Sequence, residues 1–146
     1  MEQPIFLSSD MHALKTRIPE SLARTSNAYR SMMELGIPQS FGTDAPVEDL
    51  NPFPNIYSAV TRKDMHGYPE GGYYPEECLT VEEALDFYTI GSAHAQFMED
   101  RKGRIKPGYY ADMAMLSKDI FTCDVEEIKG ITSELTLMGG KVTFQA

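Results

Sequence analysis

The sequence lacks several features that would indicate particular classes of protein. Among 146 residues it has no tryptophan and only two cysteines, Cys78 and Cys123. Two isolated thiols form neither a CxxC pair nor a disulfide framework, so they indicate a reducing, cytoplasmic setting. No apolar run approaches the roughly 18 residues of a membrane-spanning helix. The first residues also lack the basic and apolar regions of a signal peptide.

Positive charge is scarce, with 13 Lys and Arg against 22 Asp and Glu, for a formal net charge of −9. This balance argues against nucleic acid and anionic membrane surfaces as partners. Residues 1–97 hold 6 basic and 14 acidic side chains, whereas residues 98–146 hold 7 and 8, which predicts two parts with a boundary near residue 98. We expect the acid pairs Glu76–Glu77 and Glu82–Glu83 to be solvated.

Histidines are also few, and none forms a recognisable metal motif. His12, His66 and His94 are widely separated, and the sequence has no HxH, HxxxH or HExxH. A zinc site needs three or four protein ligands, so this spacing favours surface or packing histidines over a metal site.

The apolar pattern of the first forty residues predicts a parallel α/β unit. Gln3–Leu7 is predicted to be a short buried strand, with Pro4 near its start, where a missing N–H is tolerated. Ser26–Leu35 is predicted to be a helix that ends at Gly36. Gln39–Gly42 is predicted to be a second short strand, which completes the order strand, helix, strand.

Two further helices are predicted before residue 98. Asn51–Pro54 opens the first, because proline is tolerated in the first turn of a helix. Thr80 and Glu83 have the spacing of a capping box and start the second. Gly91–Ser92 is expected to break that helix, and a shorter one should continue through Met98.

From Gly103 onward the pattern becomes that of β-structure. Ala111–Leu116 is predicted to be a strand. Ile131–Leu137 and Lys141–Phe144 flank the pair Gly139–Gly140. Adjacent glycines supply the positive φ that a tight hairpin turn requires, so these segments predict a β-hairpin.

Asp44 lies in the stretch "FGTDAPVE", Phe41–Glu48, and allows two interpretations. Aspartates commonly end strands by accepting a hydrogen bond within their own turn, and spacing alone favours this Asx-turn interpretation. The second interpretation follows from the predicted architecture, because parallel α/β proteins carry their chemistry at the carboxyl ends of strands. A carboxylate there can bind a metal or act as a general base.

The order of several segments resembles the C-terminal part of an amidohydrolase. More narrowly it resembles the amidohydrolase-3 group, which includes many uncharacterised metal-dependent hydrolases, some labelled exoenzyme-regulatory proteins. "FGTDAPV" is similar to the eighth-strand pattern "GSDAPV" of this family, and "GRIKPGYYADMAMLSKD" is similar to its "GxIxxGxxADxxxLxxD" return from barrel to sandwich. The other segments that carry the resemblance are "QPIFLSSD", "AYRSMMELGIPQS", "NIYSAVTR", "LTVEEALDFYT" and "LTLMGGKVTF".

The resemblance implies an α/β fold. The complete family protein is a (β/α)8 barrel with a small β-sandwich built from both ends of the chain. Matched by order, Gln3–Leu7 is the seventh strand and Gln39–Gly42 is the eighth. Residues 1–98 then form the C-terminal portion of the barrel, and residues 99–146 form the C-terminal part of the sandwich.

The resemblance also implies an activity, the metal-dependent hydrolysis of non-peptide carbon–nitrogen bonds in amides or cyclic amides. The residue matched by Asp44 lies beside a divalent metal, typically zinc, takes a proton from metal-bound water and passes it to the leaving group. Asp44 is therefore the expected catalytic and metal-site residue. Pro46, Val47 and Asp49 are the expected substrate contacts.

This sequence departs from the family by lacking most of its metal ligands. The HxH after the first strand, the mid-barrel lysine or other bridging ligand, and the histidines of strands five and six are absent. We therefore expect this chain to be a fragment that is inactive and metal-free when isolated. Its unpaired strand edges predict self-association. The alternative is a non-enzymatic regulatory or binding module that retains the C-terminal scaffold of an amidohydrolase.

Overall fold

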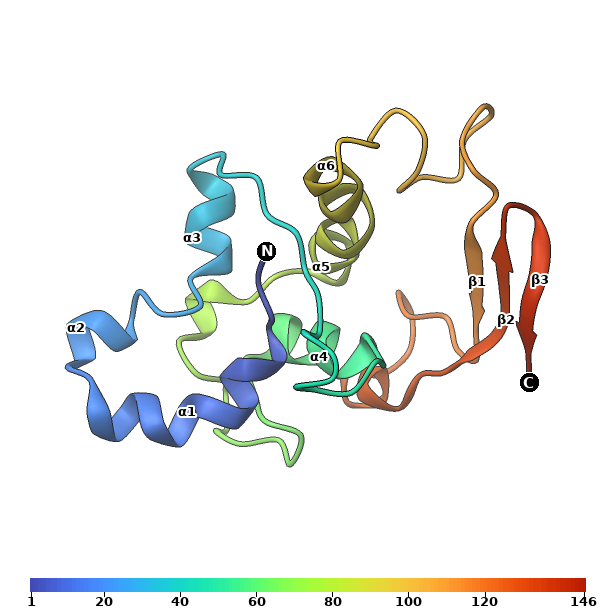
Figure 1. Ribbon diagram of the computed structural model, residues 1–146. Helices are drawn as coiled ribbons and strands as arrows, with labels where there is room; N and C mark the ends of the chain where they lie inside the picture. The colour runs from blue at the N-terminus through green and yellow to red at the C-terminus, as the bar shows by residue number, and fades with distance from the viewer.

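The computed structural model describes residues 1–146 as a mixed α/β chain. Helices α1 (Ile5–Arg17), α2 (Glu20–Ala23) and α3 (Tyr29–Glu34) lie at one end of the molecule, and a three-stranded sheet lies at the other (Figure 1). Helix α4 (Phe53–Thr61) lies between them. None of the helices combines the length and hydropathy that crossing a membrane requires.

The helices are short, and most occupy segments with helical signals in the sequence. The α-helices are Ile5–Arg17 (α1), Glu20–Ala23 (α2), Tyr29–Glu34 (α3), Phe53–Thr61 (α4), Val81–Asp86 (α5) and Ser92–Ala95 (α6). Helical turns of other types are Pro75–Glu77 (η1), Phe87–Gly91 (η2) and Val125–Gly130 (η3). The predicted helices that end at Gly36 and begin near Asn51 are confirmed as α3 and α4.

The predicted strand Gln3–Leu7 is wrong, because α1 begins within it at Ile5. Pro4 has helical dihedral angles (φ −56°, ψ −27°), and the Ile5 amide donates a buried hydrogen bond of 2.7 Å to Oδ1 of Asn55 on α4. A short apolar run fits a buried strand or a buried helix equally well, and this tertiary partner selects the helix.

The two strands expected at Gln3–Leu7 and Gln39–Gly42 are replaced by a single parallel β-bridge between Glu2 and Phe41. The Glu2 amide donates to the Ser40 carbonyl at 2.7 Å, and the Gly42 amide donates to the Glu2 carbonyl at 3.0 Å. The two segments are therefore neighbours and parallel, although neither continues as a strand.

The predicted capping box is confirmed at the start of α5. Oγ1 of Thr80 accepts from the Glu83 amide at 3.2 Å, and Oε2 of Glu83 accepts from the Thr80 amide at 2.7 Å. These two reciprocal bonds satisfy amides that a helix start leaves unpaired.

The predicted break at Gly91–Ser92 is wrong, because the helix continues from α5 to α6 through the π-helical turn η2. The predicted shorter helix does begin at Ser92, but it ends at Ala95 and does not reach Met98. The Phe87 carbonyl accepts from the Phe41 amide at 3.1 Å and from the Ser92 hydroxyl at 3.3 Å. The π-helical turn therefore contains a carbonyl that also bonds groups outside the helical ladder. A Cβ at Gly91 would lie 2.1 Å from the Gln39 carbonyl oxygen, so only glycine permits this approach.

The predicted C-terminal strands are confirmed as an antiparallel sheet in the order β1-β2-β3. Its strands are Met113–Leu116 (β1), Ser133–Met138 (β2) and Lys141–Gln145 (β3). Gly139 and Gly140 both have positive φ, at 57° and 75°, as the hairpin turn requires.

The main hydrophobic core joins residues from both sides of position 98. Ile120, Ile128 and Ile131 are buried in the same cluster as Phe41 and Tyr57. A smaller cluster of Leu7, Met11 and Tyr73 lies under α1. The boundary near residue 98 stays a prediction.

Candidate functional site

Asp44 lies in an exposed turn three residues after the bridge residue Phe41. Its backbone is left-handed (φ 58°), and its carbonyl accepts from the Val47 amide at 2.9 Å. No hydrogen bond or ion pair of the structure involves its carboxylate. The Asp44 side chain is therefore open to solvent and takes no part in holding the turn.

Other turn aspartates in this chain use their carboxylates locally. Oδ1 of Asp49 accepts from the Asn51 amide at 2.9 Å, and Oδ1 of Asp124 accepts from the Glu126 amide at 2.8 Å. These are the Asx-type bonds that aspartate makes in turns. The Asx-turn interpretation of Asp44 is therefore wrong for its side chain, although the residue does lie in a turn.

The expected substrate-contact residues follow Asp44 on the same loop. Pro46 and Val47 are exposed, with Val47 67% accessible, whereas the Asp49 carboxylate already holds the start of the next segment. The hollow on this surface is lined by Ala45, Pro46, Glu48, Asp49 and Leu50. Substrate contact by Pro46, Val47 and Asp49 stays a prediction.

The three histidines lie apart from the loop carboxylate and from a shared centre. His12 stacks on Tyr68, with ring centroids 5.8 Å apart, and His94 lies 3.3 Å from Glu99. His66 is exposed. No three His, Cys, Asp or Glu side chains lie close enough together to hold a metal ion. Zinc sites in proteins use three or four protein ligands, and no group of that size is assembled here.

Glu77 corrects the prediction that both members of its acid pair are solvated. Glu76 is exposed and pairs with Arg24 at 2.8 Å, but Glu77 is only 6% exposed. Its carboxylate accepts from the amide and the hydroxyl of Ser31, and so ties η1 to α3. The sequence gives no signal for this role, because only the fold brings Ser31 against Glu77 and leaves its neighbour Glu76 exposed beside Arg24.

Arg62 is a fully buried cation that the sequence did not single out. Its Nε donates to the Tyr73 carbonyl at 2.9 Å, and Nη1 donates to the Asn27 carbonyl at 2.5 Å. The guanidinium lies 5.8 Å from the centre of the Tyr29 ring, and burial lowers the pKa of Arg62. These contacts join α4 to two loops, so Arg62 organises the scaffold around α4.

Comparison with known proteins identifies similarity along nearly the whole chain. A family model described as "Amidohydrolase family" matches residues 2–144. YtcJ of Bacillus subtilis (strain 168), named as an amidohydrolase, is 34% identical over 98% of this chain and 27% of its own length. N-substituted formamide deformylase of Arthrobacter pascens is 31% identical over 80% of this chain and 21% of its own length.

A solved structure shows a similar fold. An amidohydrolase of Thermotoga maritima MSB8 matches 82% of this chain and 26% of its own with a TM-score of 0.61, at 19% sequence identity. The chain thus spans about a quarter of the length of the relatives that it matches.

Proposed function

The chain belongs to the amidohydrolase family, and we propose that it supplies the C-terminal part of a metal-dependent hydrolase of non-peptide carbon–nitrogen bonds. The family match over residues 2–144 supports this proposal. In the whole protein, residues 1–98 would belong to the (β/α)8 barrel and residues 99–146 to the β-sandwich.

One observation carries the assignment of Asp44 within that protein. It is an exposed turn aspartate whose carboxylate forms no bond in the fold, at the position of the family's "GSDAPV" pattern. A carboxylate in this state is free to accept a proton from a water nucleophile and return it to a leaving nitrogen. We propose that Asp44 performs this transfer, and that Pro46, Val47 and Asp49 line the substrate path.

A relative supports the proposed substrate class. The deformylase from Arthrobacter pascens is named for N-substituted formamides, small neutral amides with one acyl carbon. We propose a small amide or cyclic amide as the substrate of the whole protein. An N-substituted formamide is the first compound to test.

The family is generally metal-dependent, and a divalent metal such as zinc supplies Lewis-acid chemistry when bound. This chain offers one candidate ligand, Asp44, and no cluster of three or more. The remaining ligands would therefore come from other parts of the whole protein. Alone, the 146-residue chain should not hydrolyse amides.

The proposal is tested by assaying the whole protein with an N-substituted formamide and measuring the released amine. Asp44→Asn should lower kcat by about 10²-fold or more, because it removes a proton-transfer group. The matched control is Asp10→Asn, since Asp10 is an exposed carboxylate on α1. Undiminished activity of Asp44→Asn, or hydrolysis by the isolated chain, would contradict the proposal. No hydrolysis by a metal-loaded whole protein across an amide panel would favour the regulatory-module alternative.

We also propose that the isolated chain self-associates through β3. The Phe41 amide already donates to the Phe87 carbonyl, so the Gln39–Gly42 segment does not leave this backbone donor free for pairing with a second copy. In contrast, β3 pairs on one side only, and every residue of Lys141–Gln145 is exposed. An open edge with apolar side chains such as Val142 and Phe144 is a template for pairing with a second copy.

A further inference from the structure

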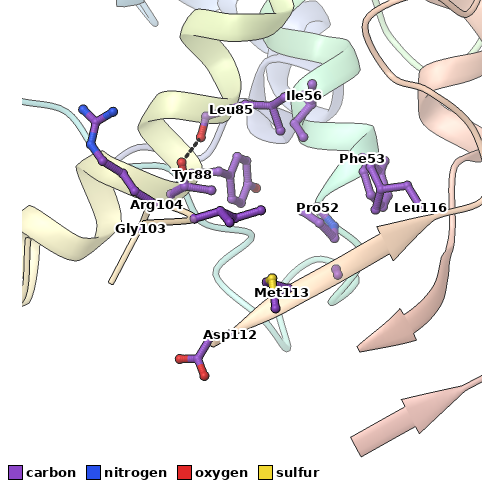
Figure 2. Close-up of a pocket in the computed structure, with 13 residues that line it drawn as sticks. Pro52, Phe53, Ile56, Leu85, Tyr88, Gly103, Arg104, Asp112, Met113 and Leu116 are labelled. Carbon is purple, nitrogen blue, oxygen red and sulfur yellow. Dashed lines mark hydrogen bonds between the residues drawn. The ribbon is translucent and has the colours of Figure 1, made fainter. Parts of the chain in front are cut away.

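A cavity of about 380 Å³ lies between α4, the α5–η2 helix and β1 (Figure 2). Most of its walls are apolar, with Phe53 and Ile56 of α4 on one side and Met113 and Leu116 of β1 on the other. No residue from Asp44 to Leu50 contributes to it, so this cavity is separate from the candidate catalytic loop. Its volume is at the lower end of the range of small-molecule pockets.

The charged side chains of the lining do not enter the cavity. Figure 2 shows the Arg104 guanidinium and the Asp112 carboxylate directed away from the apolar walls. Both residues are exposed, and Oδ1 of Asp112 accepts from the Gly139 amide at 2.8 Å. A charged ligand would therefore lose its hydration without gaining an ionic partner, so the interior favours a neutral molecule.

Tyr88 supplies an uncommitted polar group within these apolar walls. Its hydroxyl oxygen is buried and has no hydrogen-bond partner, and its ring lies among the lining residues in Figure 2. Thr89, the other hydroxyl of the lining, already donates to the Leu85 carbonyl at 2.8 Å. Because burial raises the pKa of Tyr88, its phenol stays protonated at neutral pH and can donate.

The π-helical turn η2 accounts for the position of Tyr88. Tyr88 follows Phe87, whose carbonyl is bonded to Phe41, and its ring packs edge-on against the Phe41 ring at 5.9 Å. π-Helical turns occur frequently at functional sites, where they present a side chain that a regular helix would place elsewhere. The orphan hydroxyl is thus held in place by contacts on its apolar side.

We propose that this cavity is a binding site for a small neutral molecule with an aromatic or aliphatic body and one hydrogen-bond acceptor. The body packs against Phe53, Ile56 and Leu116, and the acceptor receives the hydrogen bond of the Tyr88 hydroxyl. A buried donor without a partner is unfavourable, so a carbonyl placed there satisfies it and distinguishes the ligand from a hydrocarbon.

The proposal is tested on the 146-residue chain with two probes of similar shape, acetophenone and ethylbenzene. Methyl-labelled methionine reports binding through the NMR resonance of Met113 in the cavity wall. Acetophenone should shift this resonance saturably. Tyr88→Phe should lower the affinity for acetophenone about 3- to 10-fold and leave the affinity for ethylbenzene unchanged, because only the hydroxyl is removed. Equal weakening of both probes, or of neither, would overturn the role of the hydroxyl.

A second pair of variants tests the location. Ala114→Trp places a large ring at the cavity wall and should abolish acetophenone binding. The matched control is Met115→Trp, at the next position of β1, because Met115 is 53% exposed and does not line the cavity. Circular dichroism verifies that both variants fold. Unchanged binding by Ala114→Trp, or no saturable shift in the wild-type chain, would overturn the proposal and leave the cavity to water.

Discussion

The Tyr57 hydroxyl donates a 2.9 Å hydrogen bond to Oε2 of Glu126, and this bond joins α4 to η3. The same carboxylate pairs with Lys129 at 3.1 Å and with Lys63 at 3.2 Å. Hydrogen bonds from Lys129 and then from Tyr57 lower the pKa of Glu126 to about 2. One carboxylate thus links the first part of the chain to the segment that precedes the sheet.

The stability of this junction should depend on pH in the acid range. The folded pKa of Glu126 is depressed to about 2 from an ordinary value of 4.5. The stability that the ionised carboxylate contributes to the folded state is therefore fully present above pH 4.5. It is lost as the pH falls from 4.5 towards 2. Urea unfolding of Glu126→Gln should therefore show a smaller loss of stability between pH 5 and pH 3 than the wild type.

The contribution of Glu126 to the free energy of unfolding at neutral pH should be modest, because its side chain is 44% exposed. We expect Glu126→Gln to lower the free energy of unfolding at pH 7 by about 1 kcal/mol or less. The control is Glu134→Gln, since Glu134 is an exposed glutamate of β2 that has no ion pair. Parallel pH profiles for wild type and Glu126→Gln would contradict this account.

Gly91→Ala should destabilise the chain by about 1–3 kcal/mol, because the added methyl group forces an overpacked contact. Its Cβ would lie 2.1 Å from the Gln39 carbonyl oxygen, so the helix and the Gln39–Phe41 segment would have to separate. Gly130→Ala is the matched control, since no atom lies within 4 Å of its added Cβ. Urea midpoints that fall equally for both variants would show that the close approach to the Gln39 carbonyl does not cause the loss of stability.

Arg62→Met should lower the free energy of unfolding by about 2–4 kcal/mol, because a buried and a partly buried carbonyl group lose their donor. These are the carbonyls of Tyr73 and Asn27. Methionine retains the apolar stem of the side chain, which separates hydrogen bonding from packing. Arg17→Met, at an exposed position of α1, is the control and should leave the urea midpoint nearly unchanged. A similar midpoint for both variants would argue against a structural role for Arg62.

Substitutions at Asp44 should affect stability through the backbone alone. Its φ of 58° is left-handed, and its carboxylate holds nothing in the fold. Asp44→Gly should therefore match or exceed the wild type, whereas Asp44→Ala should lose about 1 kcal/mol. Thermal unfolding of the three proteins checks this order. A large loss in Asp44→Gly would reveal a structural role for the carboxylate.

Self-association should depend on the edge of β3. Light scattering of the isolated chain at increasing concentration should give masses above that of a monomer. Val142→Lys should return the chain to a monomer, because a charged side chain on an edge strand opposes pairing. Val47→Lys, at a residue that is also exposed but lies far away in sequence, is the control. A monomeric wild type at high concentration would exclude the proposed pairing.

The sequence predicted the elements whose signals are local. The capping box at Thr80 and Glu83 needs four consecutive residues, and the hairpin at Gly139 and Gly140 needs two backbone conformations that glycine adopts easily. Both appear in the structure at the predicted positions. The turn at Asp44 was also predictable, because aspartate favours turns irrespective of what surrounds it.

The incorrect predictions concern residues whose state is set by distant partners. Ile5 begins a helix because its amide meets Asn55, and Glu77 is buried because Ser31 lies against it. Gly91 lies within a continuous helix, where the Gln39 carbonyl approaches so closely that only glycine fits, so this glycine serves packing and does not end the helix. In each case the sequence pattern permits two states, and a contact across the fold selects one.

The hydrogen bond between Phe41 and Phe87 has a consequence for any longer protein that contains this chain. The Phe41 amide has a single proton, and the Phe87 carbonyl already accepts it. A parallel strand added beside Phe41 on that side needs the same proton, so it must first displace the helix. The η2 turn and an incoming strand therefore compete for one donor, and sheet growth at this edge is coupled to a rearrangement of the helix that carries Tyr88.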